Sequence, residues 1–164
     1  ERVMELDIAA HHGDGTEEIL ADRPGVRFLS LFQWPLFPHR RMEPTPSNAV
    51  LSPLPAGAGG EDIRNVVENV WLPEIDKFQP DLMILSAGFD AHCEERIAQL
   101  KAGEMDYACV TRLLVEASFA YCEGRLVSVL EGGYELRSLA RSVFTHLQGL
   151  IRNPLPAETC KDPN

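Results

Sequence analysis

Short apolar segments alternate with longer amphipathic segments along this chain, and this alternation constrains its fold more than any other feature of the sequence. Strands are expected over residues 2–8, 26–32, 81–89 and 125–130, and helices over 16–21, 61–78, 104–122 and 136–150. Short apolar strands that are joined by crossover helices form a parallel sheet. The sequence therefore predicts a three-layer α/β domain with a mostly parallel sheet over residues 1–153, followed by a polar tail over 154–164.

Two proline-containing segments depart from regular structure. Segment 33–60 is rich in proline and predicts an irregular loop that is longer than most connections in compact domains. Pro73 is expected to kink the helix over 61–78. The last helix has no such interruption, and its apolar stripe consists of Leu136, Leu139, Ala140, Val143, Phe144, Leu147 and Leu150.

Charge and cysteine content exclude several classes of protein. The formal net charge of −10 is expected to repel nucleic acids and anionic lipid, and the basic stretch 38–41 is interpreted as a solvated loop. No stretch approaches the roughly 18 apolar residues of a membrane span, and the first residues do not resemble a secretory signal. The four cysteines lack the Cys-x-x-Cys spacing of a zinc finger. We therefore expect a cytoplasmic protein with free thiols that binds neither nucleic acid nor membrane.

Polar side chains directly follow three of the predicted strands. His11 and His12 follow the first strand, Asp90 follows the third and Tyr134 follows the fourth. The carboxyl ends of parallel strands lie at one edge of a sheet, where open α/β folds bind their ligands. These side chains are therefore expected to converge. Each also has a structural alternative: the histidines can pack against the next helix, Asp90 can cap a turn, and Tyr134 can bury its ring.

The chemistry of these groups favours a metal-assisted reaction. Imidazole and carboxylate groups suit Zn²⁺ or Fe²⁺, and a catalytic zinc has three protein ligands and one open position. The Tyr134 hydroxyl could donate a hydrogen bond to a developing oxyanion. Gly132 and Gly133, which precede it, would let the backbone approach a substrate closely. The residues alone thus suggest hydrolysis of a carbonyl compound.

Four segments together resemble one known enzyme family: LDIAAHHGDGTEEIL, FLSLFQWPLFP, PDLMILSAGFDAH and LVSVLEGGYELRSLARSVFTHL. In this order and approximate spacing they are similar to the histone deacetylase family, in particular to its bacterial members and to the acetylpolyamine amidohydrolases. The resemblance extends over nearly the entire chain, but only over the carboxyl-terminal part of the family's catalytic domain. It implies an arginase–deacetylase fold and a zinc-dependent amidohydrolase that deacetylates acetyl-lysine or acetylpolyamines.

The resemblance also implies roles for individual residues. His11 and Asp90 match two zinc ligands of the family, and Tyr134 matches the tyrosine that polarises the substrate carbonyl. The third zinc ligand, an aspartate in the family, falls on Ala9. His12 matches the neighbour of the ligand histidine, and only a weak supporting role is implied for it.

Further positions resemble a cation site and a substrate tunnel. Asp7, together with the backbone around Ser30 and Leu31, resembles the family's monovalent-cation site. Phe37 resembles an aromatic wall of the acyl-lysine tunnel. An acetylated amine is therefore the expected substrate if the chain is active.

Two departures from the family place that activity in question. Ala9 has no oxygen to offer, so zinc affinity is expected to fall by orders of magnitude. The family's catalytic histidine pair belongs to an upstream motif that has no counterpart here. The expected function is a truncated or degenerate deacetylase with weak or no activity of its own. The alternative is a non-catalytic deacetylase-like module that acts in oligomer assembly or partner binding.

The missing upstream portion has a consequence for the surface as well. The family's sheet continues into strands from that portion, so an apolar sheet edge would be exposed here. A homodimer, or another chain that carries the missing half, is expected to cover it.

Overall fold

The computed structural model describes residues 1–151, so the predicted polar tail lies outside the described residues. The elements are β1 (Val3–Ile8), α1 (Asp14–Leu20), β2 (Val26–Gln33), β3 (Ala49–Leu54), α2 (Gly60–Val66), the π-helical turn η1 (Val67–Trp71), α3 (Leu72–Phe78), β4 (Leu82–Ala87), α4 (Glu104–Cys122), β5 (Leu126–Leu130) and α5 (Leu136–Leu150). All four predicted strands are present, and each predicted helix has a counterpart.

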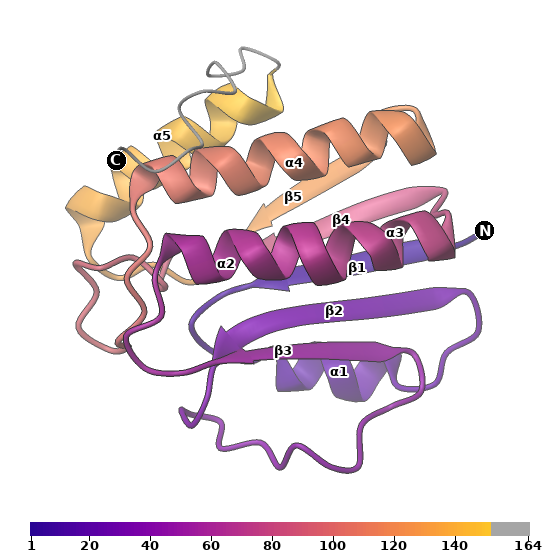
Figure 1. Ribbon diagram of the computed structural model, residues 1–164, viewed down its shortest axis with the longest axis horizontal. Coiled ribbons are helices and arrows are strands. Elements are labelled where there is room, and N and C mark those ends of the chain that lie inside the picture. The colour runs from indigo at the N-terminus through magenta and orange to yellow at the C-terminus, as the bar shows by residue number, and fades with distance from the viewer. Residues whose placement is uncertain (152–164) are drawn as a thin grey trace.

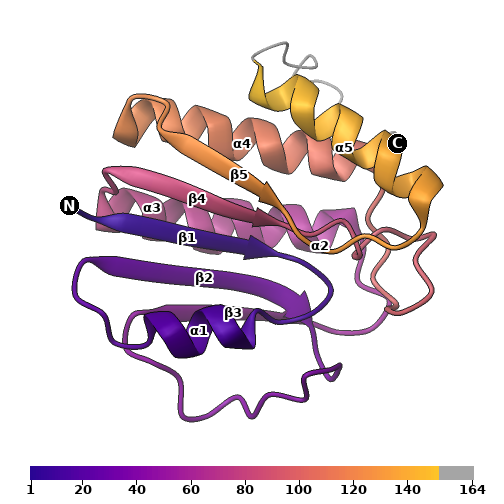
Figure 2. The ribbon, with the colours of Figure 1, turned by 180° about the vertical axis from the view of Figure 1, so that it is seen from behind.

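The described strands form a five-stranded sheet in the order β3-β2-β1-β4-β5, and each neighbouring pair is parallel. Helices α2, α3 and α4 cover one face of the sheet, whereas α1 lies on the opposite face beside β2 and β3 (Figures 1 and 2). Helix α5 packs against α4 near β5. The predicted three-layer α/β fold with a parallel sheet is confirmed.

β1 lies at the centre of the sheet and separates polar from apolar side chains. Asp7 is in register with Ser30 of β2 and Ser86 of β4, so these three polar residues lie side by side across the sheet. Side chains on alternate positions of β1, such as Leu6, belong to the hydrophobic core, which also contains Trp71 of η1. The face of the sheet that carries Asp7 is therefore polar here, and the opposite face is apolar.

β3 corrects the prediction of an irregular loop over 33–60. The strand runs parallel to β2, with Phe32 beside Pro53 in the register. Proline lacks a backbone N–H and is tolerated in a sheet mainly at an edge. Within residues 1–151, β3 pairs with β2 alone, so Pro53 occupies such an edge. The proline content of the segment therefore concealed the strand.

The helix predicted over 61–78 contains a π-helical turn directly before Pro73. The Leu72 N–H donates to the Val67 carbonyl, five residues earlier, and Pro73 then lies in the first turn of α3. A proline ring collides with the carbonyl four residues before it in a regular α-helix. The disturbance expected at Pro73 therefore takes the form of a wider turn, while Ile75 stays fully buried.

Only part of the predicted apolar stripe of α5 faces the core. Leu139 and Val143 pack against it, whereas Phe144 and Leu147 are 60% and 50% exposed. The fully buried positions of α5 are instead Ser138, Ser142 and His146. Apolar spacing identified the helix correctly, but it did not identify which face of the helix is buried.

The cysteines depart from the expectation of free thiols. Cys93 and Cys122 are free, whereas Cys109 is disulfide-bonded. In the described part of the chain, every helix is too short or too polar to cross a membrane.

Candidate functional site

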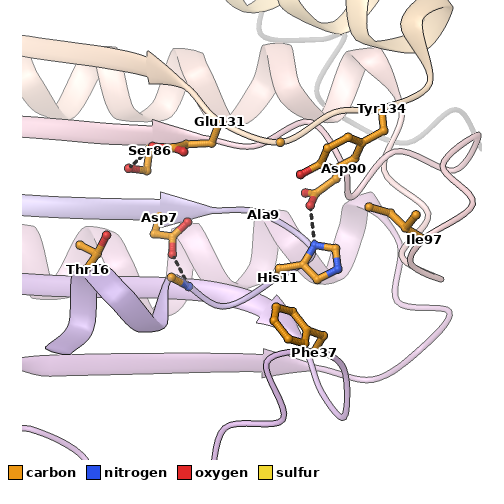
Figure 3. Close-up of a pocket in the computed structure, with 12 residues that line it drawn as sticks. Asp7, Ala9, His11, Thr16, Phe37, Ser86, Asp90, Ile97, Glu131 and Tyr134 are labelled. Carbon is orange, nitrogen blue, oxygen red and sulfur yellow. Dashed lines mark hydrogen bonds and ion pairs between the residues drawn. The ribbon is translucent and has the colours of Figure 1, made fainter.

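The carboxyl ends of β1, β4 and β5 open into a cavity of about 500 Å³. Figure 3 shows side chains from these three strand ends, and from the segment after β2, directed toward this space. The lining residues are Asp7, Ala9, His11, Gly13, Thr16, Phe37, Ser86, Asp90, Ile97, Glu131, Gly132 and Tyr134. The geometry thus brings the predicted residues His11, Asp90 and Tyr134 to one site.

His11 and Asp90 are joined directly across the ends of β1 and β4. The His11 Nδ1–H donates to Asp90 Oδ2 at 2.7 Å, and the Ala10 backbone N–H donates to Asp90 Oδ1 at 2.7 Å. The Asp90 side chain is 2% exposed, whereas that of His11 is 26% exposed. Both carboxylate oxygens therefore have partners, and the second ring nitrogen of His11 is left for the cavity.

Gly132 and Gly133 are required by the space around Asp90 and Tyr134. A Cβ atom on Gly132 would lie 2.9 Å from Asp90 Oδ2, and one on Gly133 would lie 2.6 Å from a methyl group of Leu139. Gly133 also has a φ of +136°, a conformation that side chains disfavour. The two glycines therefore let the turn after β5 pass close to Asp90 and Leu139, and their close approach to a substrate stays a prediction.

Tyr134 lies above this turn with 63% of its surface exposed. Its ring lies on the Asp90 side of the cavity in Figure 3. Its backbone N–H donates to Glu95 Oε1 at 2.6 Å, and the N–H of Glu135 donates to the same oxygen at 2.9 Å. Glu95 is thus a positioning residue that the sequence reasoning missed. No spacing rule connects an acid on one loop to amides some forty residues away.

Asp7 forms the floor of the cavity and has a perturbed acidity. Its Oδ2 accepts hydrogen bonds from Ser30 Oγ at 3.1 Å and from the Gly13 N–H at 3.0 Å. Burial raises the pKa of Asp7 to about 7, although these hydrogen bonds act to lower it. The binding of a monovalent cation by Asp7 and the backbone around Ser30 and Leu31 stays a prediction.

His12 is not among the lining residues of the cavity and belongs to a buried polar chain. Its Nε2–H donates to Glu17 Oε2 at 2.6 Å, and its Nδ1 lies 3.0 Å from Ser30 Oγ. Burial lowers the pKa of His12. Burial acts to raise the pKa of Glu17, but hydrogen bonds from Arg40 and His12 hold it below its ordinary value. The structural alternative therefore describes His12 better than a role at the cavity.

Arg40 contradicts the interpretation of 38–41 as a solvated loop. Its guanidinium pairs with both oxygens of Glu17, and its side chain is only 11% exposed. Phe37, in the same segment, lines the cavity with its ring centroid 6.5 Å from that of His11. The segment after β2 is therefore an organised part of the site.

The residues at the cavity do not complete a three-ligand zinc site. Ala9 lines the space where the sequence comparison expects a carboxylate, and its methyl group offers no donor. His11 Nδ1 and Asp90 Oδ2, the two remaining donors, are hydrogen-bonded to each other. The donor set is one ligand short of what catalytic zinc requires.

A second group of potential ligands lies beside the loop after β4. Ligand atoms of His92, Glu94 and Glu104 all lie within 4.8 Å of one another. The guanidinium of Arg141 already donates to both carboxylates, with Glu94 at 2.5 Å. The backbone N–H of Glu94 also donates to His92 Nδ1 at 3.1 Å, which leaves the proton of a neutral ring on Nε2. Arg141 thus pairs with both carboxylates of this cluster, whereas the buried His92 Nε2 lies 3.5 Å from Glu104 Oε1 without a hydrogen bond.

Known proteins share this fold and these motifs. The histone deacetylase domain model matches residues 1–150. A probable deacetylase of Archaeoglobus fulgidus is 37% identical over 142 residues, which cover 83% of this chain and 40% of that protein. Histone deacetylase 10, chloroplastic, of Oryza sativa subsp. japonica is 33% identical over 168 residues. This match covers 99% of this chain and 38% of that protein.

Solved structures agree with the sequence relatives. The HDA15 HD domain superimposes with a TM-score of 0.84 at 28% identity, covering 97% of this chain and 47% of that one. An acetylpolyamine aminohydrolase from Burkholderia pseudomallei superimposes with a TM-score of 0.80 at 26% identity. The superposition covers 92% of this chain and 45% of that one. This chain thus spans less than half the length of these proteins. With the family model matching residues 1–150 and the strand-end motifs gathered at one cavity, the chain belongs to the histone deacetylase family.

Proposed function

We propose that this chain is the carboxyl-terminal part of a deacetylase domain that keeps the acyl-amine side of the site but has a weakened zinc centre. One observation carries this proposal. His11, Asp90 and Tyr134 reach a single cavity from three separate strand ends, and Ala9 lines the same cavity in place of a carboxylate. Hydrolysis of acetyl-lysine or an acetylpolyamine by the isolated chain is therefore expected to be weak or absent.

The residues that are present have defined tasks in such a reaction. Tyr134 supplies a phenolic O–H that can donate to the oxyanion formed when water attacks the acetyl carbonyl. Glu95 holds the backbone of Tyr134 and thereby the turn that carries this hydroxyl. Ala9 leaves the set of zinc donors incomplete, so the residues present do not hold a catalytic zinc with three protein ligands.

The charge of the cavity supports an amine as substrate. Asp7, Asp90 and Glu131 line it, and none of the lysines and arginines within residues 1–151 does. An acetylated polyamine carries positive charge on its remaining amines, so an acidic lining favours its approach. The proposal that the substrate is an acylated amine thus has support from the cavity itself as well as from the family.

Ala9 also favours a second candidate function, that of a non-catalytic module. Exposed apolar side chains on β5 and α5 support a role in assembly, because Val127 and Val129 are 51% and 46% exposed and Phe144 is 60% exposed. Zinc content distinguishes the two functions.

A cytoplasmic location stays part of the proposal and is tested by fractionation of cells that express the native protein.

Substitution of Ala9 tests the weakened zinc centre. We expect Ala9→Asp to tighten zinc binding by about 100-fold or more, because it restores a third donor and a negative charge beside His11 and Asp90. Calorimetric zinc titration measures the change, and an acetyl-lysine hydrolysis assay follows the consequence.

Ala9→Asn is the matched control, since its side chain has the size of aspartate without the charge, and it should gain far less affinity. Stoichiometric zinc with turnover in the unmodified chain would contradict the weakened centre. Equal zinc affinities of the Ala9→Asp variant and the unmodified chain would show that this part of the cavity is not a zinc site.

A further inference from the structure

The segment 34–48, which joins β2 to β3, supplies one wall of the cavity through Phe37. The Phe37 ring is 66% exposed, so packing holds it only weakly. Its centroid nevertheless lies 6.5 Å from that of His11, edge-on to the imidazole, and Figure 3 shows the ring beside His11 at the cavity. The position of this ring must therefore depend on whatever fixes the backbone of the segment.

Arg40 ties that backbone to α1. Its Nε–H donates to Glu17 Oε2 at 2.6 Å, and an Nη2–H donates to Oε1, so the guanidinium holds the carboxylate with two parallel hydrogen bonds. The same guanidinium donates to the Pro44 carbonyl at 3.2 Å, and the Arg40 carbonyl accepts from Trp34 Nε1 at 3.4 Å. Across the described residues 35–45, the other side-chain hydrogen bonds stay within the segment.

The Glu17 end of this pair is fixed in the protein interior. The side chains of Arg40 and Glu17 are 11% and 9% exposed. Glu17 Oε2 also accepts from His12 Nε2 at 2.6 Å, and the His12 side chain is 1% exposed and packed 4.5 Å from the ring centroid of Phe32. The pair is therefore a rigid link between the core and the wall of the cavity, three residues from Phe37.

We propose that Arg40 is a positioning residue, which fixes Phe37 at the position where it contacts the alkyl stem of an acylated amine. The inference rests on the proposed function for the identity of the ligand class. It adds that the pairing of Arg40 with Glu17 sets which stem length the cavity accepts. Arg40 acts through Phe37 and does not itself contact the ligand, since it is absent from the cavity lining.

Two ligands that differ by one methylene test this role: Nε-acetyl-lysine methylamide and Nδ-acetylornithine methylamide. The full chain is expected to distinguish their dissociation constants by about tenfold, a typical effect of one methylene in an apolar pocket. Arg40→Ala should bring the two constants to within about threefold, because an unfixed Phe37 no longer favours one stem length. Arg40→Lys keeps the charge but not the bidentate hydrogen bonding to Glu17. Its ratio of the two dissociation constants should therefore lie between those of the full chain and of Arg40→Ala.

Arg41→Ala is the matched control, because it removes the same charge from the next, exposed residue of the same segment. It should keep the wild-type ratio of dissociation constants. A ligand-free readout accompanies the titrations: the NMR signals of the His11 ring, which sense the nearby Phe37 ring, should shift in Arg40→Ala but not in Arg41→Ala. Arg40→Lys replaces Arg40→Ala in the comparison if the alanine variant does not fold.

The outcomes separate this inference from the proposed function. A folded Arg40→Ala variant with the wild-type ratio would overturn the role of Arg40, as would an equal loss of discrimination in Arg41→Ala. Failure of both ligands to bind the wild-type chain would instead reject the proposed function. In that case unshifted His11 signals in Arg40→Ala would also reject the placement of Phe37 by Arg40.

Discussion

Glu5 is a carboxylate in the middle of the central strand β1, and its burial has a measurable consequence. The residue is 7% exposed, and its Oε1 accepts a hydrogen bond from Ser86 Oγ at 2.9 Å. Burial raises the pKa of Glu5 to about 7 from 4.5, the Ser86 hydrogen bond opposes this, and the nearby charge of Glu131 adds to the rise. The folded protein therefore binds a proton at Glu5 more readily than the unfolded chain does.

This shift predicts how Glu5 affects stability at different pH. Its favourable contribution is complete below pH 4.5 and is lost as the pH rises through 7, because ionisation then opposes burial. Glu5→Gln mimics the protonated carboxyl, so we expect it to stabilise the protein by about 2 kcal/mol at pH 8 and by almost nothing at pH 4.5. Urea unfolding at both pH values measures the difference.

The exposed Glu68 provides the control for this experiment, since Glu68→Gln should change stability equally at both pH values. A Glu5→Gln variant with the same gain at pH 4.5 and pH 8 would show that Glu5 does not titrate in this range.

Helix α5 is attached to the domain through polar groups as well as through Leu139 and Val143, which explains why its apolar spacing did not reveal its orientation. Thr111 Oγ1 donates to the Tyr107 carbonyl at 2.6 Å, so it must accept from His146 Nδ1–H, also at 2.6 Å. His146 Nε2 can then accept from Ser128 Oγ at 2.9 Å. Both bonds are satisfied by a neutral imidazole, and this hydrogen-bonded set connects α5 to α4 and β5.

The neutral state of His146 predicts acid sensitivity of this helix contact. Burial lowers the pKa of His146 to about 4 from 6.5. The stability that depends on the neutral ring is complete above pH 6.5 and is lost as the pH falls toward 4, by about 3 kcal/mol at most. We therefore expect His146→Asn to be less stable than the unmodified chain at pH 7. Between pH 7 and pH 4.5 the variant should lose less stability than the unmodified chain does, as measured by urea unfolding.

His39 is a suitable control, because it is exposed and its φ of +58° is one that asparagine tolerates. His39→Asn should retain the pH dependence of the unmodified chain. If His146→Asn also retained it, the imidazole would not be the group that titrates.

Seen over the whole molecule, β5 leaves one edge of the sheet open. Among the strands that the structure describes, β5 pairs with β4 alone, and its residues Val127, Val129 and Leu130 are 46–55% exposed. Such an edge offers both apolar surface and unpaired backbone groups to another polypeptide. The homodimer expected from the sequence, or association with a chain that carries the rest of the domain, stays a prediction.

Light scattering during gel filtration measures the predicted dimer. We expect the chain to form a dimer at micromolar concentration and Val129→Lys to shift it toward monomer, since a charge on an edge strand opposes strand pairing. Ile19→Lys is the control, because Ile19 is 65% exposed on α1, away from this edge. A monomeric parent chain, or an equal effect of both substitutions, would contradict the prediction.

The sequence was most informative where local pattern and long-range geometry agree. Strand ends of a parallel sheet meet at one edge, so the convergence of His11, Asp90 and Tyr134 could be predicted without coordinates. Side-chain partners that are distant in sequence could not be predicted. Glu95 reaches the backbone of Tyr134, and Arg40 reaches Glu17, through contacts that no periodicity encodes. The edge strand β3 was missed for a related reason. The low strand propensity of Pro53 is overridden by its position at the edge of the sheet.

The central position of β1 has a consequence for how the chain folds during synthesis. β1 pairs on one side with β2 and on the other with β4, which follows about 80 residues later. β4 begins about 50 residues after β2 ends, so at ribosomal rates of roughly 5–20 residues per second the paired β1 and β2 wait for about 2.5–10 s before β4 is synthesised. During that interval one flank of a largely apolar two-stranded ribbon is unprotected. Chaperone demand should therefore be greatest before translation passes β4, and synonymous codons that slow this stretch should lower the yield of native protein.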